Sequence, residues 1–457
     1  MPFADFILQH ESDDPVRLLL ARDRYPDIDI DLAVTTLEVR RRLRTKVPEW
    51  YAVPSLIYPS RLSGEQCSSS ETARYKAMVC GSSLVPEPSL RDPSHKWAPR
   101  RVGLRGPRKS PDFWGGFAEG GHRFGDQTAP ANKRLRIADL TGGMGVDTWA
   151  FAKVAGEVLY NEMQVELARA TELNFRELGV ENVRFRNLLV EPGKVREVLD
   201  GFEPDVIFLD PARRAGDGRK VFLIEECQPD VLGLLPELFE ASRYVLLKLS
   251  PMADITMACK RLGTQVKEVH VVAAGGECKE LLFLLDREWD GAPATFVVEG
   301  GAVMEIPGGP SASSGTAGPS VISTGAKRSG EICLFEPGKA LLKAGAFDVP
   351  CEFGLTKLGQ HTHLYVGEAV PEELRPFGKV FEIREVLPLN NRTMKEAGKR
   401  WPQAEVTARN VPMTSDLLRK KIGCASGGDI HLFGVRVDAA AEAGNYLIVT
   451  QKRYGTD

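Results

Sequence analysis

The middle of the chain, residues 133–290, alternates short apolar segments with longer amphipathic ones. The apolar segments have the length of strands, and stretches long enough for a helix separate the first five. This rhythm predicts an α/β fold with a doubly wound, Rossmann-like sheet of seven strands. The predicted strands are Arg136–Leu140, Glu157–Asn161, Asn182–Phe185, Asp205–Leu209, Tyr244–Leu249, Val269–Ala273 and Leu281–Leu285.

The last two predicted strands are joined differently from the others. Only the segment from Ala274 to Glu280 separates them. A parallel crossover needs about a dozen residues or more, so this pair should form a terminal antiparallel hairpin.

The flanking regions have other patterns. Asp13–Pro15 is typical of a helix start, and Leu37 and Leu43 lie among arginines in a helical stretch, so residues 1–80 are predicted to form a helical amino-terminal domain. After residue 331, a predicted strand precedes a helix that starts near Pro337. The predicted divisions are 1–80 (helical), 81–132 (a Pro-, Gly- and Arg-rich insertion, expected to be poorly ordered), 133–290 (α/β), 291–376 (small α+β, with a Gly- and Ser-rich loop at 300–330) and 377–457 (a second α+β domain).

Composition narrows the choice of function. A length of 457 residues predicts two or three domains. The net charge of -3 gives no overall basic field, so any nucleic acid must be bound by local patches. The eight cysteines have no metal-like spacing, so neither a structural metal nor a disulfide framework is expected. No apolar run of about 20 residues and no secretory signal is seen, which predicts a cytoplasmic protein that does not span a membrane.

The loop after the first predicted strand is glycine-rich. It reads Asp139-Leu140-Thr141-Gly142-Gly143-Met144-Gly145-Val146-Asp147, and Thr148 stands where a dinucleotide motif would require glycine. Such glycines let backbone amides approach a ligand, although a tight strand-to-helix turn would use them as well. Glu162 ends the second strand, where an acid typically accepts hydrogen bonds from a ribose. Together they favour a nucleoside cofactor.

A second group of polar residues follows the fourth and fifth strands. Asp210-Pro211-Ala212-Arg213-Arg214 offers a carboxylate and a free carbonyl to a donor on a substrate, unless Asp210 simply caps a helix. The fifth strand leads into Ser250, and the hairpin tip carries Glu277, Cys278 and Lys279. Because the carboxyl ends of parallel strands share one edge of a sheet, we expect these loops to converge there.

Taken in order, these motifs resemble a known family. Five motifs look like those of the bacterial class I S-adenosylmethionine-dependent methyltransferases with a carboxy-terminal THUMP-like domain. They are Leu62 to Lys76 (with Glu65-Gln66-Cys67-Ser68-Ser69 and Thr72-Ala73), the Asp139–Asp147 loop, Asp210-Pro211-Ala212-Arg213-Arg214, Lys248-Leu249-Ser250-Pro251-Met252 and Glu277-Cys278-Lys279-Glu280-Leu281-Leu282. The likeness extends to Arg409-Asn410-Val411-Pro412 in residues 377–457 and implies a THUMP-like domain there, after a ferredoxin-like segment.

The resemblance implies roles for individual residues. Cofactor binding is expected of Asp139, Thr141, Gly142, Gly143, Gly145, Asp147 and Glu162. Many relatives have an acid near the adenine amine after the third strand, whereas Asn187 stands here, and its side-chain oxygen can accept from that amine instead. Asp210, Pro211 and Arg213 are expected to face the methyl acceptor as catalytic residues. Substrate contacts are expected of Arg214, Ser250, Glu277, Lys279 and Arg409. The implied cofactor is S-adenosylmethionine, and the implied partner is RNA.

Two departures bear on the chemistry. Methyltransferases that act on exocyclic amines commonly have Asp/Asn-Pro-Pro-aromatic, whereas Ala212 and Arg213 stand here. Arg213 and Arg214 could stack on a base or bind phosphate, or form a solvated pair. In 5-methyluridine methyltransferases a cysteine follows the fifth strand, whereas Leu249 occupies that place, and Cys278 is either a substitute or a small packing residue.

Basic clusters could supply phosphate contacts. They are Arg40–Arg42 with Arg44 and Lys46, Arg392 with Lys395, Lys399 and Arg400, and Arg419 to Lys421, and solvated helix faces are the alternative reading. The sequence thus favours methylation of structured RNA. A noncatalytic RNA-binding module, or methylation of a protein or small molecule, remain alternatives.

Overall fold

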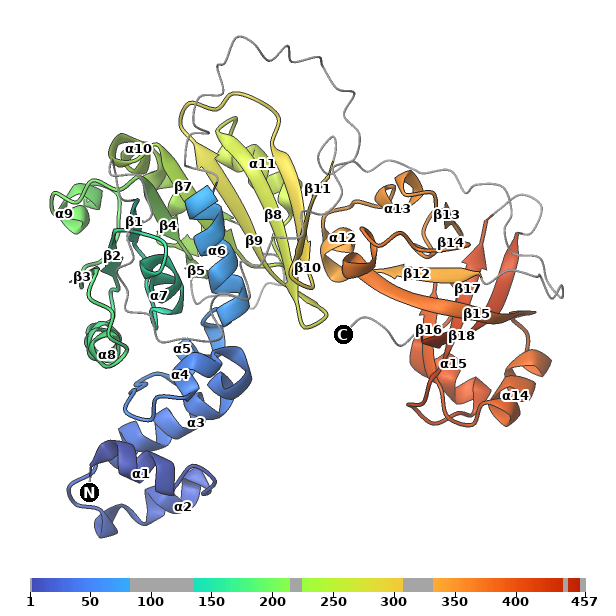
Figure 1. Cartoon of the computed structure of the whole chain (residues 1–457), viewed down its shortest axis with the longest axis horizontal. Coiled ribbons are helices and arrows are strands. Elements are labelled where there is room, and N and C mark those ends of the chain that lie inside the picture. The colour runs from blue at the N-terminus through green and yellow to red at the C-terminus, as the bar shows by residue number, and fades with distance from the viewer. Residues whose placement is uncertain (1, 83–134, 214–223, 307–331, 439–442, 453–457) are drawn as a thin grey trace. The chain divides into compact units, whose positions relative to one another are not determined.

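The computed structural model describes residues 2–82, 135–213, 224–306, 332–438 and 443–452. The chain divides into two compact units (Figure 1). Among the described residues, the first contains 2–82, 135–213, 224–269 and 280–293, and the second contains 270–279, 294–306, 332–438 and 443–452. The predicted insertion at 81–132 lies almost entirely outside the described residues.

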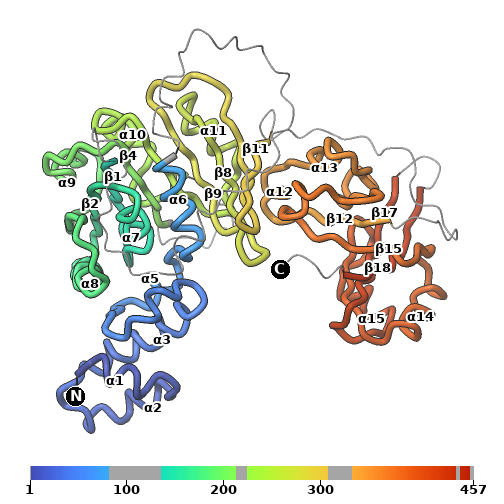
Figure 2. The backbone as a smooth tube through the Cα atoms, viewed as in Figure 1, coloured from blue at the N-terminus to red at the C-terminus, as the bar shows by residue number. Residues whose placement is uncertain are grey.

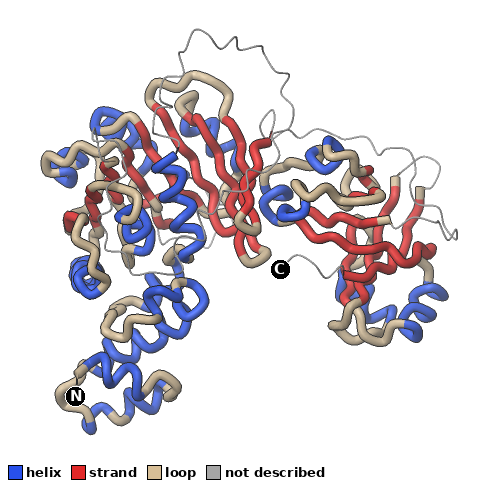
Figure 3. The backbone as a smooth tube through the Cα atoms, viewed as in Figure 1, coloured by secondary structure: helices blue, strands red, loops and turns tan. Residues whose placement is uncertain are grey.

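A nine-stranded sheet contains the main strands of the first unit (Figure 3). Its strand order is β11-β10-β8-β9-β7-β4-β1-β2-β3; β2, β1, β4 and their outer neighbours β3 and β7 run parallel, whereas β9 is antiparallel to β7. All seven predicted strands are therefore present, and the terminal hairpin is confirmed. The strands are β1 Arg136–Asp139, β2 Glu157–Asn161, β3 Val183–Arg186, β4 Val206–Leu209, β7 Tyr244–Leu249, β8 Val266–Ala274 and β9 Glu277–Asp286.

Helices connect the parallel strands and pack through aromatic side chains. Phe151 of the first connecting helix meets Phe208 of β4 at a ring-centre distance of 5.2 Å, and Phe175 of the second meets Phe185 of β3 at 5.5 Å. These rings bury the apolar face that the amphipathic pattern predicted. The helices are α7 Val146–Ala152, α8 Val165–Glu177, α9 Val195–Leu199, α10 Val231–Ala241 and α11 Ile255–Leu262.

The sheet has nine strands, two more than the seven predicted. Gly300 and Gly301, which begin the predicted Gly- and Ser-rich loop, form the two-residue turn of a hairpin between β10 (Ala294–Glu299) and β11 (Ala302–Ile306). Their positive φ angles of 57° and 73° explain the choice of glycine, since such turns place both central residues in the left-handed region. The rest of that loop, residues 307–330, lies outside the described part of the chain.

The amino-terminal helices belong to the same compact unit as the parallel strands β1, β2, β3, β4 and β7 (Figure 2). Trp50 is fully buried and meets the rings of Trp149 and Phe175 at 6.0 and 6.3 Å. The side chain of Asn174 on α8 accepts from Ile57 N at 2.9 Å and donates to Ile57 O at 2.8 Å. The elements are α1 Phe3–Gln9, α2 Pro15–Leu20, the 3₁₀ helix Arg22–Arg24, α3 Ile30–Lys46, α4 Pro48–Tyr51, α5 Arg61–Gln66 and α6 Ser70–Ser82.

A sheet of order β13-β14-β12-β15-β18-β17-β16 organises the second unit. Its core contains Leu334, Phe381, Phe433 and Ile448, all at most 1% exposed. Residues from both the predicted small α+β segment and the final domain thus share one sheet. The elements are β12 Cys333–Pro337, α12 Lys339–Lys343, α13 Val349–Glu352, β13 Thr356–Lys357, β14 Tyr365–Gly367, the 3₁₀ helix Arg375–Phe377, β15 Gly378–Pro388, α14 Asn391–Arg400, β16 Glu405–Arg409, α15 Ser415–Ile422, β17 Ile430–Val437 and β18 Gly444–Lys452.

Replacing Asn174 should test how the amino-terminal helices are attached. Asn174→Ala removes both hydrogen bonds and leaves the peptide groups of Ile57 unpaired near a buried surface, so we expect the free energy of unfolding to fall by about 2–3 kcal/mol. The exposed neighbour Leu173 provides the control, and Leu173→Ala should cost well under half of that. Urea unfolding followed by circular dichroism measures both, and equal losses would contradict the assignment.

Candidate functional site

The glycine-rich loop after β1 is held against β2. Gly142 N donates to Asn161 O at 2.7 Å, and a β-carbon at Gly142 would lie 2.1 Å from the ring of Tyr160. Gly145 has a φ of 85° and is the N-cap residue of α7. These two positions therefore require glycine for close approach and for backbone conformation, and the loop leaves its backbone open on the side of a cavity.

Glu162 closes this loop from the end of β2. One carboxylate oxygen accepts from Gly143 N at 3.0 Å and the other from Gln164 N at 2.9 Å. The residue is 8% exposed and lines the cavity beside the glycine loop. Each carboxylate oxygen can accept more than one hydrogen bond, so Glu162 can still bind a diol.

Asp139 supports the loop from beneath. Its carboxyl group is fully buried, accepts from Thr141 N at 3.2 Å, and shares a 2.6 Å hydrogen bond with the hydroxyl of Thr148. Burial raises the pKa of Asp139 from 3.8 to about 8, against the lowering effect of the Thr148 hydrogen bond. Asp139 is not part of the cavity lining, so it shapes the loop and does not face the cavity.

Asp210 lies at the end of β4, beside the same loop. Asp210 N donates to the hydroxyl of Thr141 at 2.6 Å, which joins the loops after β1 and β4. The next residues, Ala212–Arg213, form a short strand β5 paired with β6 (Cys227–Gln228), so Asp210 does not cap a helix. The carboxylate is about one third exposed and lines the cavity.

The cavity brings together the loops after β1, β2, β3 and β4 with part of the amino-terminal region. It is lined by Ser63, Gln66, Cys67, Ser68, Leu140, Thr141, Gly142, Gly143, Met144, Gly145, Val146, Asp147, Asn161, Glu162, Met163, Gln164, Leu167, Leu188, Leu189, Val190, Asp210, Ala212, Gln228 and Pro229. Its glycine backbone, carboxylates and apolar side chains form a set suited to a nucleoside with a charged tail.

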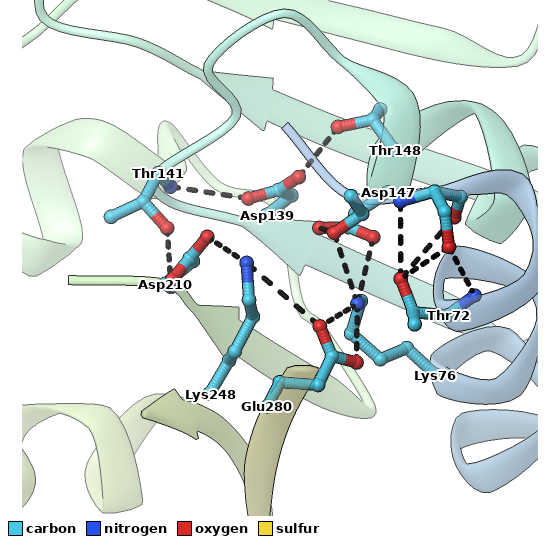
Figure 4. A network of polar contacts seen from close by, with 11 residues as sticks. Thr72, Lys76, Asp139, Thr141, Asp147, Thr148, Asp210, Lys248 and Glu280 are labelled. Carbon is cyan, nitrogen blue, oxygen red and sulfur yellow. Dashed lines mark hydrogen bonds and ion pairs between the residues drawn. The ribbon is translucent and has the colours of Figure 1, made fainter. Parts of the chain in front are cut away.

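A row of buried charged side chains continues inward from Asp210, beginning with Lys248 (Figure 4). Lys248 on β7 contacts an oxygen of Asp210 at 2.5 Å and lies 4.0 Å from Glu280 on β9. Burial favours the neutral amine, but the carboxylates of Asp210, Glu280 and Asp147 outweigh it and raise the pKa of the Lys248 ammonium above its ordinary value. Lys248 therefore stays charged.

The row of charges continues into the amino-terminal region. Lys76 on α6 is fully buried and donates to both oxygens of Glu280 at 2.7 and 2.8 Å. The same ammonium lies 3.2 Å from Asp147 on α7 and 3.1 Å from the hydroxyl of Ser68. Three carboxyl groups thus surround two ammonium groups, and the excess of one carboxylate suits a site for a cationic ligand.

Other predicted site residues lie elsewhere. Asn187 donates through its amide to Glu162 O at 2.5 Å and does not line the cavity. The Ser250 hydroxyl accepts from Met252 N at 3.2 Å, and Pro211 is buried; neither lines the cavity. Arg213 lies in β5, next to the lining residue Ala212.

Several predicted substrate residues are not brought to this cavity. Glu277 and Lys279 form a 2.7 Å ion pair in the second unit, which also contains Cys278. Arg409 is in that unit too and pairs with Glu336 at 2.7 Å. Arg214 lies outside the described residues.

The predicted basic clusters differ in how many of their side chains have a hydrogen-bond or ion-pair partner. Arg40 is 2% exposed and donates to two backbone carbonyls, so its role is structural. Arg41, Arg42 and Lys46 contact Glu11, Asp13 or Glu65, and Arg44 is exposed. Within α14 and α15, Arg392, Arg400 and Arg419 pair with acids. In the described parts of the chain, the exposed lysines of these helices have no ion pair; they are Lys395, Lys399, Lys420 and Lys421.

Three residues of the site were not predicted from the sequence. Asn161 joins the loops after β1 and β3, because its side chain donates to Leu140 O and Leu188 O and accepts from Leu188 N. Lys76 and the cavity residue Cys67 come from the amino-terminal region, and burial raises the pKa of the Cys67 thiol. The sequence suggested Cys278 for a chemical role, whereas the cysteine that lines the cavity is Cys67. The motif around Cys67 was the available signal.

Comparison with known proteins agrees with this architecture. A family model described as THUMP domain-like matches residues 378–452, and one described as a ferredoxin-like domain matches residues 334–374. A solved structure from Porphyromonas gingivalis W83, named as a candidate methyltransferase, has a TM-score of 0.69 and 28% identity, and the match covers 98% of this chain and 97% of that one.

A curated protein is similar over a shorter stretch. An uncharacterized RNA methyltransferase of Enterococcus faecalis (strain ATCC 700802 / V583) is 31% identical over 94 residues, which make up 21% of each chain. The chain thus spans about a fifth of the length of that relative. In the described residues no helix is long and apolar enough to cross a membrane, and no group of three or more His, Cys, Asp or Glu is placed to hold a metal.

The buried carboxyl of Asp139 predicts a pH effect on stability. With its pKa raised from 3.8 to about 8, the folded chain keeps a proton that the unfolded chain releases between these values, so the free energy of unfolding should fall as pH rises through this window. Asp139→Asn should reduce that slope by up to about 1.4 kcal/mol per pH unit between pH 5 and 7. Urea unfolding at several pH values measures it, with Asp27→Asn as the exposed control. An unchanged slope would contradict the assignment.

Proposed function

We propose that this chain, which has the class I methyltransferase fold with a C-terminal THUMP-like domain, transfers a methyl group from S-adenosylmethionine to structured RNA. The observation that carries the proposal is the shared cavity: the glycine loop, Glu162 and Asp210 all line it. These are the groups expected for the methionine part, the ribose and the methyl acceptor. The proposed location is the cytoplasm.

The residues present fit this cofactor. The backbone at Gly142 and Gly145 leaves no room for β-carbons, and Glu162 offers carboxylate oxygens at the rim of the same hollow. Glu162 would hold the ribose hydroxyls, and the loop of Gly143 and Gly145 would hold the methionine part. Asn161, Asp139 and Thr141 would act indirectly, by fixing the loops. When bound, S-adenosylmethionine supplies an electrophilic methyl group on a sulfonium.

Asp210 would orient the acceptor. Lys248 contacts one of its carboxylate oxygens, and the second oxygen would accept from an amine or hydroxyl hydrogen of the acceptor. Pro211 has no N–H, so it cannot donate a hydrogen bond to a nearby backbone carbonyl, and that carbonyl can accept from the substrate instead. In an in-line displacement the chain mainly supplies alignment and stabilises the charge that develops on the acceptor as its bond to the methyl group forms. Arg213 and Arg214 keep their proposed role of contacting a base or phosphate.

RNA is the substrate class supported best. The curated relative is named an RNA methyltransferase, and the THUMP-like domain places four exposed lysines without ion pairs in the described chain on α14 and α15. Such lysines can neutralise phosphates without reading sequence. Arg409 is engaged by Glu336, so a phosphate would have to compete with that carboxylate.

A transfer assay tests the function. Purified chain, S-adenosylmethionine labelled on its methyl group, and total RNA from cells lacking this gene should give labelled RNA, whereas RNA from cells that carry the gene should take up far less. Asp210→Asn should lower the rate by about 100-fold or more while leaving affinity for the cofactor unchanged. Asp14→Asn, which preserves a helix cap in the amino-terminal region, is the matched control.

The same assay separates the alternatives. Label found in the protein fraction of those cells, and absent from RNA, would replace RNA by a protein substrate. No label in any fraction, together with RNA binding, would indicate a noncatalytic RNA-binding module.

A further inference from the structure

Lys76, the buried lysine of α6, is connected to the carboxylate of Asp210 through the side chains of Glu280 and Lys248. The order of contacts is Asp147–Lys76–Glu280–Lys248–Asp210 (Figure 4). Charges alternate along this row, and its members come from α6, α7, β7, β9 and the loop that follows β4. We propose that Lys76 is a positioning residue, which keeps Lys248 on Asp210 by occupying Glu280. The inference rests on the proposed function of Asp210.

The distances show how the two lysines divide the carboxylates. Lys76 contacts both oxygens of Glu280 at 2.7 and 2.8 Å, whereas Lys248 lies 4.0 Å from Glu280 and 2.5 Å from Asp210. Glu280 is thus satisfied by Lys76, and Lys248 remains with Asp210. Without Lys76, Glu280 would be a buried carboxylate lacking its close partner, with Lys248 as the nearest remaining cation in this row.

Burial makes this competition strong. Lys76 is 0% exposed, the Glu280 side chain is 3% exposed and the Lys248 side chain is 12% exposed. Water cannot readily solvate a carboxylate at this depth, so Glu280 must find a cation or take up a proton. The strand register holds Lys248 opposite Leu282, two residues from Glu280, so a change of side-chain rotamer is enough to bring its ammonium across.

The position of Lys248 matters because it determines which oxygen of Asp210 faces the acceptor. With Lys248 on one oxygen, the other is left for a hydrogen-bond donor in the cavity. If Lys248 moves to Glu280, the Asp210 carboxylate loses its fixed orientation and its balancing charge. Buried ion pairs can often be replaced by apolar residues without a loss of folding stability. A contribution to stability alone therefore does not explain this row of charges.

The test combines structure and rate. In a crystal structure of Lys76→Met at pH 8, the Lys248 ammonium should lie within hydrogen-bond distance of Glu280 and away from Asp210. In the RNA transfer assay kcat should fall about tenfold or more, while the dissociation constant of S-adenosylmethionine stays within about twofold. Lys260→Met, an exposed lysine of α11, is the matched control.

A second-site variant distinguishes positioning from simple destabilisation. Lys76→Met combined with Glu280→Leu removes the competing carboxylate, so Lys248 should return to Asp210 and kcat should recover to within about threefold of the unmodified chain. Lys248→Met should abolish activity both in the unmodified chain and in the double variant. Lys248→Arg, which keeps the positive charge, should retain part of the activity. Should Lys76→Met not fold, Lys76→Gln serves instead, since its amide can donate to Glu280 without a charge.

Two results would overturn the inference. One is a Lys76→Met structure in which Lys248 still contacts Asp210; the other is a folded double variant whose kcat stays as low as that of Lys76→Met. Failure of the proposed function has a different signature, because the unmodified chain would then transfer no methyl group to RNA, while the crystal structures still decide where Lys248 lies.

Discussion

The structure of the site depends on burying alternating charges from separate parts of the chain in one row. Asp147, Lys76, Glu280, Lys248 and Asp210 come from separate parts of the sequence. The four that lie behind the partly exposed Asp210 are largely buried next to groups of opposite charge. Removing one partner from such a set leaves an unpaired charge at high cost. The amino-terminal helices are therefore bound to the sheet at the place where the chemistry is proposed to occur.

The glycine loop imposes a second constraint, which is steric. The ring of Tyr160 occupies the space beside Gly142 that a side chain would need, and the Tyr160 hydroxyl donates to Gly143 O at 2.6 Å. The loop can thus lie flat against β2 and expose its backbone to the cavity. Asp139, kept protonated around neutral pH by burial, supports the turn without placing a second full charge under it.

Much of the fold could be predicted from the sequence because period and spacing carry it. Strands such as Glu157–Asn161 and Tyr244–Leu249 have the predicted bounds, since short apolar segments between helices leave little choice of register. The β10–β11 hairpin was missed because Gly300-Gly301 was interpreted as the beginning of a loop. Two adjacent glycines are typical both of a loop and of a tight turn, and only the pairing of the flanking strands distinguishes them.

The site could be predicted only in part. Residues that directly follow strands, such as Glu162 and Asp210, were placed correctly in one cavity because the sheet edge brings them together. Lys76 lies on a helix outside the predicted α/β region, and no pattern along the chain indicates that it reaches Glu280, 204 residues away. Asn187 and Ser250 also follow strands but make local backbone contacts, which spacing cannot reveal.

The central claim is that the hollow beside Glu162 binds an adenosyl sulfonium, and calorimetric titration of the purified chain with S-adenosylmethionine tests it most directly. We expect saturable binding by the unmodified chain and by Glu166→Ala, a change at an exposed acid of α8. Affinity should fall by about 10- to 100-fold in Glu162→Ala, as expected for loss of hydrogen bonds to a charged acceptor. Absence of binding by the unmodified chain, or equal affinity in all three, would contradict it.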